Sequence, residues 1–281
     1  MQRRIRTFKV QTAQRFVHSQ SHLPGSNPAK LRDMPDAPTQ VAPGVHRLGN
    51  ALVNCYLIEE GNDLTLVDGG MPGFRPQLNE YLRSRGRSVN DIDAVILTHA
   101  HSDHVGMVEG IRLDAPAPVH VHERDAEMAR TGKVHKRDGS MLPYLIRPAT
   151  WKLFLVGGRN GAARTPNVEQ VTTFDAEGDL DVPGRPRIIP TPGHSPGHVS
   201  FHLPEHGILI AGDALCTYNP LTGKRGPQVL PSAFAADSLQ MLASLEAIER
   251  IDAQLTLFGH GEPWEQSPAE AVARAREVGL T

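Results

Sequence analysis

Seven side chains of metal-ligand type follow predicted strand ends in this 281-residue chain. Four of them are adjacent in the pattern His-x-His-x-Asp-His, formed by His99, His101, Asp103 and His104. Imidazole nitrogens and carboxylate oxygens are preferred ligands of zinc and of neighbouring transition metals. Because these side chains lie in one short loop, they can converge without a long-range fold to assemble them. The pattern therefore predicts a metal site.

The other three candidate ligands, His194, Asp213 and His260, lie in glycine-containing turns. Glycine lets the backbone turn tightly at a strand end and leaves the neighbouring side chain pointing into a cleft. Taken singly, each segment is more typical of an ordinary turn. Together with the histidine-rich loop, however, the turns complete a set of seven candidate ligands.

Short strands from about residue 45 onward must position these side chains. Residues 53–57 and 64–67 form a predicted hairpin, and residues 76–85 have the spacing of a helix. The run 94–98 is uninterruptedly apolar, which is typical of a strand buried on both faces. Similar strands precede the remaining candidates, at 187–189, 207–211 and 255–258. Each candidate ligand is therefore expected at a sheet edge, where sites are usually built.

Composition excludes several classes of protein. The formal net charge is −2, there are only 2 cysteines, and no run approaches the roughly 20 apolar residues of a membrane helix. An integral membrane protein and a disulfide scaffold are both excluded. We expect a small-molecule substrate and neither nucleic acid nor a membrane as partner, while the oligomeric state stays open.

The N-terminus differs from the rest of the chain in charge. Residues 1–30 carry six basic side chains and no acidic one, and residues 23–44 are rich in proline. We predict an extension and arm over 1–44 and a single domain over 45–281. The extension has some likeness to an organelle transit peptide, although a solvated extension on a cytoplasmic protein is the favoured interpretation.

The ordered motifs resemble those of the metallo-β-lactamase superfamily, from about Gly49 to Glu262. The resemblance implies an α/β fold, the four-layer αββα sandwich. It implies that His99, His101 and His194 hold one metal and that Asp103, His104 and His260 hold a second. It further implies that Asp213 bridges both metals and that Asp68 orients a liganding histidine.

This ligand set implies two zinc ions, although iron or manganese is also compatible with it. A water between the metals would lose a proton readily, since zinc lowers its pKa from 15.7 to roughly 7. The resulting bridging hydroxide would attack a carbonyl, and Asp103 or the second metal would assist the leaving group. The catalytic candidates are therefore Asp103 and Asp213.

The chain differs from individual subfamilies at several positions, and these differences limit the class of substrate that we expect. Antibiotic-degrading members usually lack the bridging carboxylate that Asp213 supplies, and only 21 residues follow His260, too few for the glutathione-binding region of glyoxalase II. Lactonases carry a tyrosine three residues after the bridging aspartate, where this chain has Cys216 and the nearest tyrosine is Tyr218. Tyr218 is a candidate substrate residue that could reach the site from a different turn, although a surface or core tyrosine is the favoured interpretation. We therefore predict a dinuclear hydrolase of a carboxylic ester, lactone or thioester, like the glyoxalase II and lactonase branches. A mononuclear iron oxygenase of the sulfur-dioxygenase kind and a true β-lactamase are the alternatives.

Several further residues have open interpretations. His198 either supports the site or caps a turn, and Cys216 is interpreted as a small buried side chain. His120 and His122 share one face of a predicted strand and are taken as structural or exposed, because no further ligand flanks them. The basic and apolar segment 133–165, with Trp151 and Phe154, is either a substrate lid for an acyl-bearing molecule or a packed helical insertion. A helix over 234–251 is expected to bury Leu239, Leu242, Leu245 and Ile248.

Overall fold

The first sheet contains seven strands in the order of the chain. The computed structural model describes residues 38–50, 52–175 and 177–281. Neighbours pair antiparallel from β1 to β4 and parallel from β4 to β7. The strands are β1 (Thr39–Ala42), β2 (Val45–Gly49), β3 (Asn54–Glu60), β4 (Asp63–Val67), β5 (Ala94–Ile96), β6 (Val119–His122) and β7 (Thr172–Phe174).

The second sheet has five strands in the order β14, β11, β10, β9, β8, and a separate hairpin joins β12 to β13. The pair β11 and β14 is parallel, and the other neighbours are antiparallel. The strands are β8 (Gly178–Asp179), β9 (Arg187–Pro190), β10 (Val199–Leu203), β11 (Ile208–Gly212), β12 (Cys216–Tyr218), β13 (Arg225–Gln228) and β14 (Leu255–Phe258).

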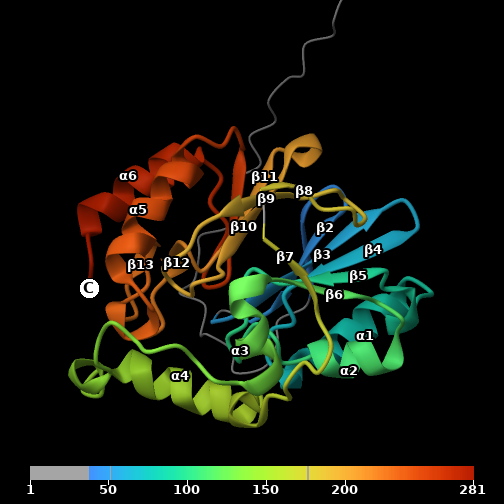
Figure 1. Ribbon diagram of the computed structural model, residues 1–281, viewed down its shortest axis with the longest axis horizontal. Helices are drawn as coiled ribbons and strands as arrows, with labels where there is room; N and C mark the ends of the chain where they lie inside the picture. Colours follow the sequence, from blue (N-terminus) through green and yellow to red (C-terminus); the bar gives the residue numbers. More distant parts are fainter. Residues whose placement is uncertain (1–37, 51, 176) are drawn as a thin grey trace, which may run out of the picture. The chain divides into compact units, whose positions relative to one another are not determined.

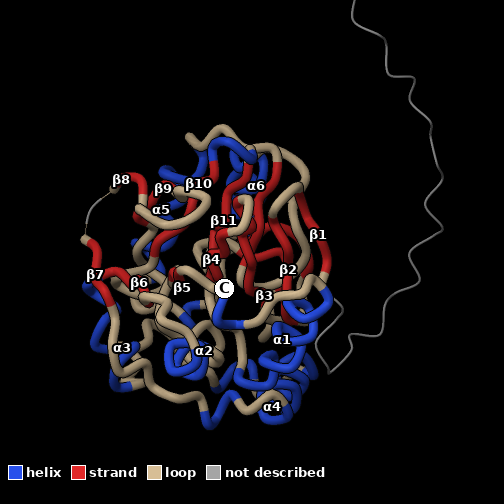
Figure 2. Tube along the Cα trace, turned by 90° about the vertical axis from the view of Figure 1, so that its right-hand side faces the viewer, coloured by secondary structure: helices blue, strands red, loops and turns tan. Residues whose placement is uncertain are grey.

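Helices cover the outer faces of both sheets. Figures 1 and 2 show the helices that precede β7 on one side of the strands, with α5 and α6 on the other. The α-helices are α1 (Arg75–Ser84), α2 (Val108–Asp114), α3 (Ala126–Thr131), α4 (Pro148–Arg159), α5 (Ser238–Glu249) and α6 (Pro268–Val278). The short 3₁₀ helices are η1 (Pro72–Phe74), η2 (Val89–Asp91), η3 (Glu123–Asp125), η4 (Leu142–Tyr144), η5 (Ala162–Arg164), η6 (Pro204–His206) and η7 (Ser232–Phe234).

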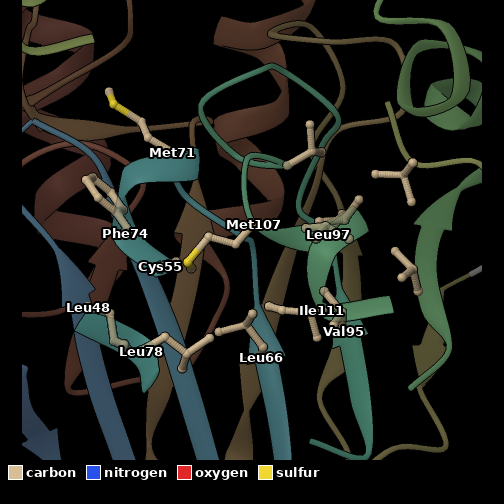
Figure 3. Close-up of a cluster of buried hydrophobic side chains, with 14 of the residues drawn as sticks. Leu48, Cys55, Leu66, Met71, Phe74, Leu78, Val95, Leu97, Met107 and Ile111 are labelled. Carbon is tan, nitrogen blue, oxygen red and sulfur yellow. The ribbon is translucent and has the colours of Figure 1, made fainter. Parts of the chain in front are cut away.

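Three apolar clusters separate the four layers. One lies between the sheets and includes Ile96 from β5 and Phe201 from β10. A second packs the outer face of the first sheet against helices such as α1 and α2; Figure 3 shows Leu66, Leu78 and Ile111 in it. The third packs the second sheet against α5 and α6. Strand β11 is buried along its whole length because a sheet covers one face and helices the other. The predicted αββα sandwich is therefore confirmed.

The predicted elements that precede the candidate ligands are present, with small shifts in their ends. One side-chain prediction is wrong, because Leu239 is 73% exposed while Leu245 and Ile248 are buried. Asp237 caps α5 by accepting from the backbone N–H of Gln240, so the helix begins at Ser238. The buried positions then repeat from Ser238, and Leu239 lies about 100° around the helix from that face.

The first strand begins inside the segment predicted as an arm. Residues 39–42 form β1, which pairs with β2, so the end of that segment belongs to the sheet. Residues 1–37, which hold most of the predicted extension, lie outside the described residues. None of the helices in the described ranges combines the length and the apolar run that crossing a bilayer requires.

Candidate metal centre

The ends of four strands from both sheets bring the candidate ligands to one edge of the sandwich. The histidine-rich loop follows β5, His194 follows β9, Asp213 follows β11 and His260 follows β14. Strands β11 and β14 are parallel neighbours in which Gly212 pairs with Phe258. Their carboxyl ends therefore lie side by side and hold Asp213 and His260 together.

The seven candidates form two triads and a shared carboxylate. In the triad of His99, His101 and His194, the nitrogens available to a metal lie within 4.8 Å of one another. The same holds for the ligand atoms of Asp103, His104 and His260. These are the two groups of three that the resemblance implies. The ligand atoms of His99, His104 and Asp213 form a third group that is equally compact.

Asp213 lies between the triads. Its Oδ2 is 3.3 Å from Nε2 of His194 and 3.0 Å from Nε2 of His260, and its Oδ1 is 3.5 Å from Nε2 of His104. One carboxylate therefore reaches histidines of both groups, as a bridging ligand must.

A glycine makes this close approach possible. A Cβ at residue 259 would lie 2.0 Å from Oδ1 of Asp213 and 2.7 Å from Cε1 of His104. No side chain fits at that distance without moving the carboxylate. Gly259 therefore shapes the space in which Asp213 and His104 meet.

Two ring nitrogens are held by groups outside the triads. Nδ1 of His104 lies 2.9 Å from Oδ2 of Asp68, and the same carboxylate accepts from the backbone N–H and the hydroxyl of Thr98. Nδ1 of His260 lies 2.5 Å from the carbonyl oxygen of Leu52. Each contact places the proton on Nδ1 and leaves Nε2 free to bind a metal.

Several buried atoms of the centre lack a hydrogen-bond partner among the described residues. They are Nε2 of His99, Nε2 of His104, Nδ1 of His194 and Oδ1 of Asp213. A buried polar atom without a partner is costly, so these atoms fit a site that binds a ligand. Imidazole and carboxylate donors in two triads fit transition-metal ions well.

Burial and mutual repulsion oppose protonation of part of the cluster. Burial lowers the pKa of His99 well below its ordinary value, and the neighbouring His104 and His194 lower it further. Burial would raise the pKa of Asp213, but His260 and His104 outweigh it and hold that pKa well below the usual range. Burial would lower the pKa of His104 and of His260, but Asp213 outweighs burial and raises both. A metal ion bound between Asp213 and these two imidazoles would therefore displace their protons.

His198 supports Asp213 through the backbone. Its Nε2 lies 2.9 Å from the backbone nitrogen of Asp213 and accepts that N–H, while its Nδ1 lies 2.9 Å from Oγ1 of Thr191. The ring is buried. Of the two interpretations of His198, the contacts favour support of the site.

Asp125 joins two loops of the centre and was not among the sequence candidates. Its carboxylate accepts from Oγ of Ser195 at 2.6 Å, from the backbone N–H of Gly197 at 2.7 Å and from that of Ala100 at 3.2 Å. It therefore ties the turn that carries His194 to the histidine-rich loop. Nothing in the spacing around Asp125 signals this role, because its partners are far away in the sequence.

A pocket of about 330 Å³ opens onto the centre. Five of its lining residues are candidate ligands: His101, Asp103, His194, Asp213 and His260. Apolar and small residues form the rest of its wall, namely Met71, Val134, Leu153, Phe154, Gly157, Gly158, Ala162, Ala163, Pro220 and Phe234. Ser102 and Arg137 add polar groups to the lining.

The three candidate substrate residues have different positions. Phe154 lines the pocket. Trp151 does not; its side chain is 61% exposed and its Nε1 donates to the carbonyl of Leu145. Tyr218 is buried in the apolar cluster beneath the first sheet, with the guanidinium of Arg225 over its ring, and does not line the pocket. Only Phe154 of these three is placed to contact a bound molecule.

Comparison with known proteins identifies the family. The family model described as the metallo-beta-lactamase superfamily matches residues 48–260. The chain belongs to this superfamily. YobT of Bacillus subtilis (strain 168) is 34% identical over 163 residues, which span 58% of this chain and 61% of YobT. The probable metallo-hydrolase YflN of the same organism is 28% identical over 233 residues, 80% of this chain and 86% of YflN.

Solved structures of the superfamily support the fold. A crystal structure of the metallo-beta-lactamase family protein TTHA1429 from Thermus thermophilus is 26% identical with a TM-score of 0.61. The match covers 85% of this chain and 79% of that one. The predicted superfamily and the predicted class of enzyme, a hydrolase, are therefore confirmed.

Proposed function

We propose that this chain is a dinuclear metal-dependent hydrolase that cleaves a carboxylic ester, a lactone or a thioester. The observation that carries the proposal is the pair of triads joined by Asp213, whose carboxylate contacts histidines of both. A centre with a single metal ion would use only one of the two triads as ligands. Zinc is the favoured metal for this donor set, and iron and manganese are compatible with it.

The metals and the chain divide the chemistry between them. Bound metal ions would supply a nucleophile, by lowering the pKa of a coordinated water to about 7, and would polarise the carbonyl of the substrate. Asp213 would contribute a ligand to both ions, and His198 fixes its position by accepting its backbone N–H. Asp68 fixes the tautomer of His104 and so keeps its Nε2 directed at the centre.

Asp103 is the group best placed to handle a proton. Its side chain is 26% exposed, lines the pocket, and has Oδ2 3.7 Å from Nε2 of His260. Asp213, by contrast, is almost fully enclosed. A carboxyl group at the open side of the centre can pass a proton to a departing alkoxide or thiolate. Asp103 would serve as this acid.

The apolar pocket supports an acyl-bearing substrate. Leu153 and Phe154 of α4 line the same cavity as Phe234, Met71 and five of the candidate ligands. Burial of an acyl group there would exclude water from the reacting carbonyl. Arg137 lines the same cavity and pairs with no acidic side chain in the described part of the chain, so a substrate with an anionic group also fits.

Metal analysis combined with a hydrolysis panel tests the proposal. We expect about two first-row metal ions per chain, loss of hydrolysis on chelation, and recovery on adding zinc. The panel would contain lactones, alkyl esters, thioesters, phosphodiesters and β-lactams. Asp213→Ala should lower metal content and turnover together, whereas Asp252→Asn, a change of an exposed aspartate, should alter neither. Full activity with one metal per chain, or a metal content that Asp213→Ala leaves unchanged, would contradict the dinuclear assignment.

A further inference from the structure

Large exposed apolar side chains are concentrated on one short stretch of the surface. Eleven such side chains occur in the described part of the chain, and six of them lie between residues 142 and 155. Ile146 is 84% exposed, Leu142 74% and Trp151 61%. We call the six the α4 face: Leu142, Leu145, Ile146, Trp151, Phe154 and Leu155. The Trp151 ring contacts that of Phe154, and its Nε1 donates to the carbonyl of Leu145, so α4 and the segment before it meet at this residue. Exposed apolar side chains that gather in this way usually mark an interaction surface.

The exposed side of α4 has the pattern of a helix turned toward an apolar partner. Trp151, Phe154, Leu155 and Gly158 follow helical spacing and are all exposed, while Val156 is buried. A helix on the surface of a globular protein normally presents charged residues outward instead. In Figure 1, α4 runs along the margin of the described fold, well away from α5 and α6.

The same segment is strongly basic. Residues 128–168 contain eight Lys and Arg side chains and one acidic residue, Asp138, for a net charge of +7. The remaining described residues carry 14 basic and 28 acidic side chains, for a net charge of −14. Lys136, six residues before Leu142 in the sequence, and Arg147, directly after Ile146, are both exposed. The partner of this face must therefore accept apolar side chains and also carry negative charge.

Three partners could cover the α4 face: a second copy of the chain, residues 1–30 of the same chain, or a lipid surface. The positive charge of the segment decides among them. A second copy in a two-fold dimer would place each α4 face against itself and bring two positive segments together. Residues 1–30 of the same chain are also basic, with six basic side chains and no acidic one. An anionic lipid surface offers both of the required features, since basic side chains bind its headgroups while aromatic and aliphatic ones enter the acyl boundary.

We propose that the α4 face docks the protein on an anionic lipid surface. This binding does not depend on hydrolysis. It departs from the expectation of no membrane partner, which rested on the absence of a spanning segment and took no account of exposed surface. Phe154 belongs both to the α4 face and to the pocket lining, with Leu153 and Gly158 beside it. Docking would therefore bring the mouth of the pocket to the lipid.

Vesicle binding by the full chain tests the proposal. The probes are phosphatidylcholine vesicles with and without about 30 mol% phosphatidylglycerol, in cosedimentation at about 0.05 M and about 0.5 M NaCl. We expect the chain to bind the anionic vesicles at low salt, at least about tenfold more strongly than the neutral ones, and to dissociate at high salt. The fluorescence of exposed Trp151 should shift to the blue on binding, and Trp151→Phe should abolish that shift.

Matched variants separate the α4 face from general stickiness. Ile146→Ser combined with Leu155→Ser should weaken vesicle binding by about tenfold, since both side chains leave water only on docking. Leu113→Ser and Leu239→Ser remove equally exposed leucines from α2 and α5 and should change nothing. Arg147→Glu should weaken binding, whereas Lys224→Glu, on the exposed turn before β13, should have little effect.

Three results would overturn the proposal. The first is no binding to either kind of vesicle, and the second is equal binding to neutral and anionic vesicles. The third is self-association in sedimentation velocity that Ile146→Ser with Leu155→Ser abolishes, which would assign the face to a second copy. Thermal unfolding of each variant in the absence of lipid checks that the fold is intact. None of these outcomes depends on whether the chain hydrolyses any substrate.

Discussion

The backbone N–H of Asp213 donates a hydrogen bond to Nε2 of His198, with 2.9 Å between the two nitrogens. The opposite ring nitrogen, Nδ1, lies 2.9 Å from Oγ1 of Thr191, so His198 is neutral with its proton on Nδ1. His198 belongs to neither triad, yet it fixes the backbone of Asp213, whose carboxylate contacts both triads. The relationship couples the conformation of one turn to both candidate metal positions.

His198→Phe should therefore damage the centre without removing a ligand. The phenyl ring fills similar space but leaves the Asp213 amide buried and unpaired, at a cost of about 1–3 kcal/mol in unfolding free energy. Metal affinity should fall at both positions, by about 10–100-fold. Isothermal titration with zinc measures the affinity and urea unfolding measures the stability. His202→Phe, on the neighbouring strand β10, is the control, and equal losses in both variants would show that His198 has no special role.

Gly259→Ala should disrupt the centre more severely. The new Cβ would lie 2.0 Å from Oδ1 of Asp213, so the carboxylate must move away from His104. We expect metal content to fall well below that of the unaltered chain, as measured by plasma emission analysis. Gly86→Ala is a suitable control, because a Cβ at Gly86 meets nothing within 4 Å. That change costs about 1 kcal/mol through its left-handed backbone and should leave the metals in place.

The sequence was sufficient to predict the fold class and to nominate the residues of the two triads. Histidine and aspartate side chains directly after apolar strands can be recognised as candidate ligands, because their spacing and the end of the strand are both local features of the sequence. The pocket wall was predicted less well. Trp151 and Phe154 lie within one turn of α4, yet only Phe154 lines the cavity, since the orientation of that helix is set by tertiary packing. Asp125 was missed for the same reason, because all of its partners are distant in sequence.

Asp125→Asn should loosen the link between the two histidine-bearing loops. The carboxamide keeps one acceptor oxygen but cannot accept from Ser195, Gly197 and Ala100 together. We expect a loss of about 2–3 kcal/mol in stability and about 10-fold weaker metal binding. Asp138→Asn is the matched control, since its exposed carboxylate accepts from the backbone N–H of Ser238 and from neither histidine-bearing loop. If Asp125→Asn bound zinc as tightly as Asp138→Asn, Asp125 would have no part in shaping the centre.

The stability of the fold should decrease in acid partly through His46. Burial lowers the pKa of His46 from its ordinary value of 6.5, although the hydrogen bond with Glu59 opposes that shift. Below about pH 6.5 the unfolded chain therefore takes up a proton that the folded chain resists, and stability falls as the pH falls. His46→Gln should show a smaller decrease in unfolding free energy between about pH 7.5 and pH 5 than the unaltered chain. Exposed His135→Gln should follow the unaltered chain, and an identical pH response in all three would remove His46 from the explanation.

The length of the acyl group should control turnover. Apart from Ser102 and Arg137, the pocket wall beyond the candidate ligands is apolar or lined by glycine, so each methylene that enters it contributes up to about 0.8 kcal/mol of binding free energy. We expect kcat/KM to rise with chain length across a series of lactones or alkyl esters, and to stay low for penicillins. Phe154→Ala should flatten that rise, because Phe154 lines the pocket, whereas Trp151→Ala should leave it unchanged, because Trp151 does not. Steady-state kinetics on both variants across the series makes the comparison, with Trp151→Ala as the control for helix α4 itself.

A rise that Trp151→Ala flattens and Phe154→Ala preserves would move the acyl site from the cavity to the outer side of α4. Faster turnover of a β-lactam than of the best ester or lactone would reject the acyl pocket altogether.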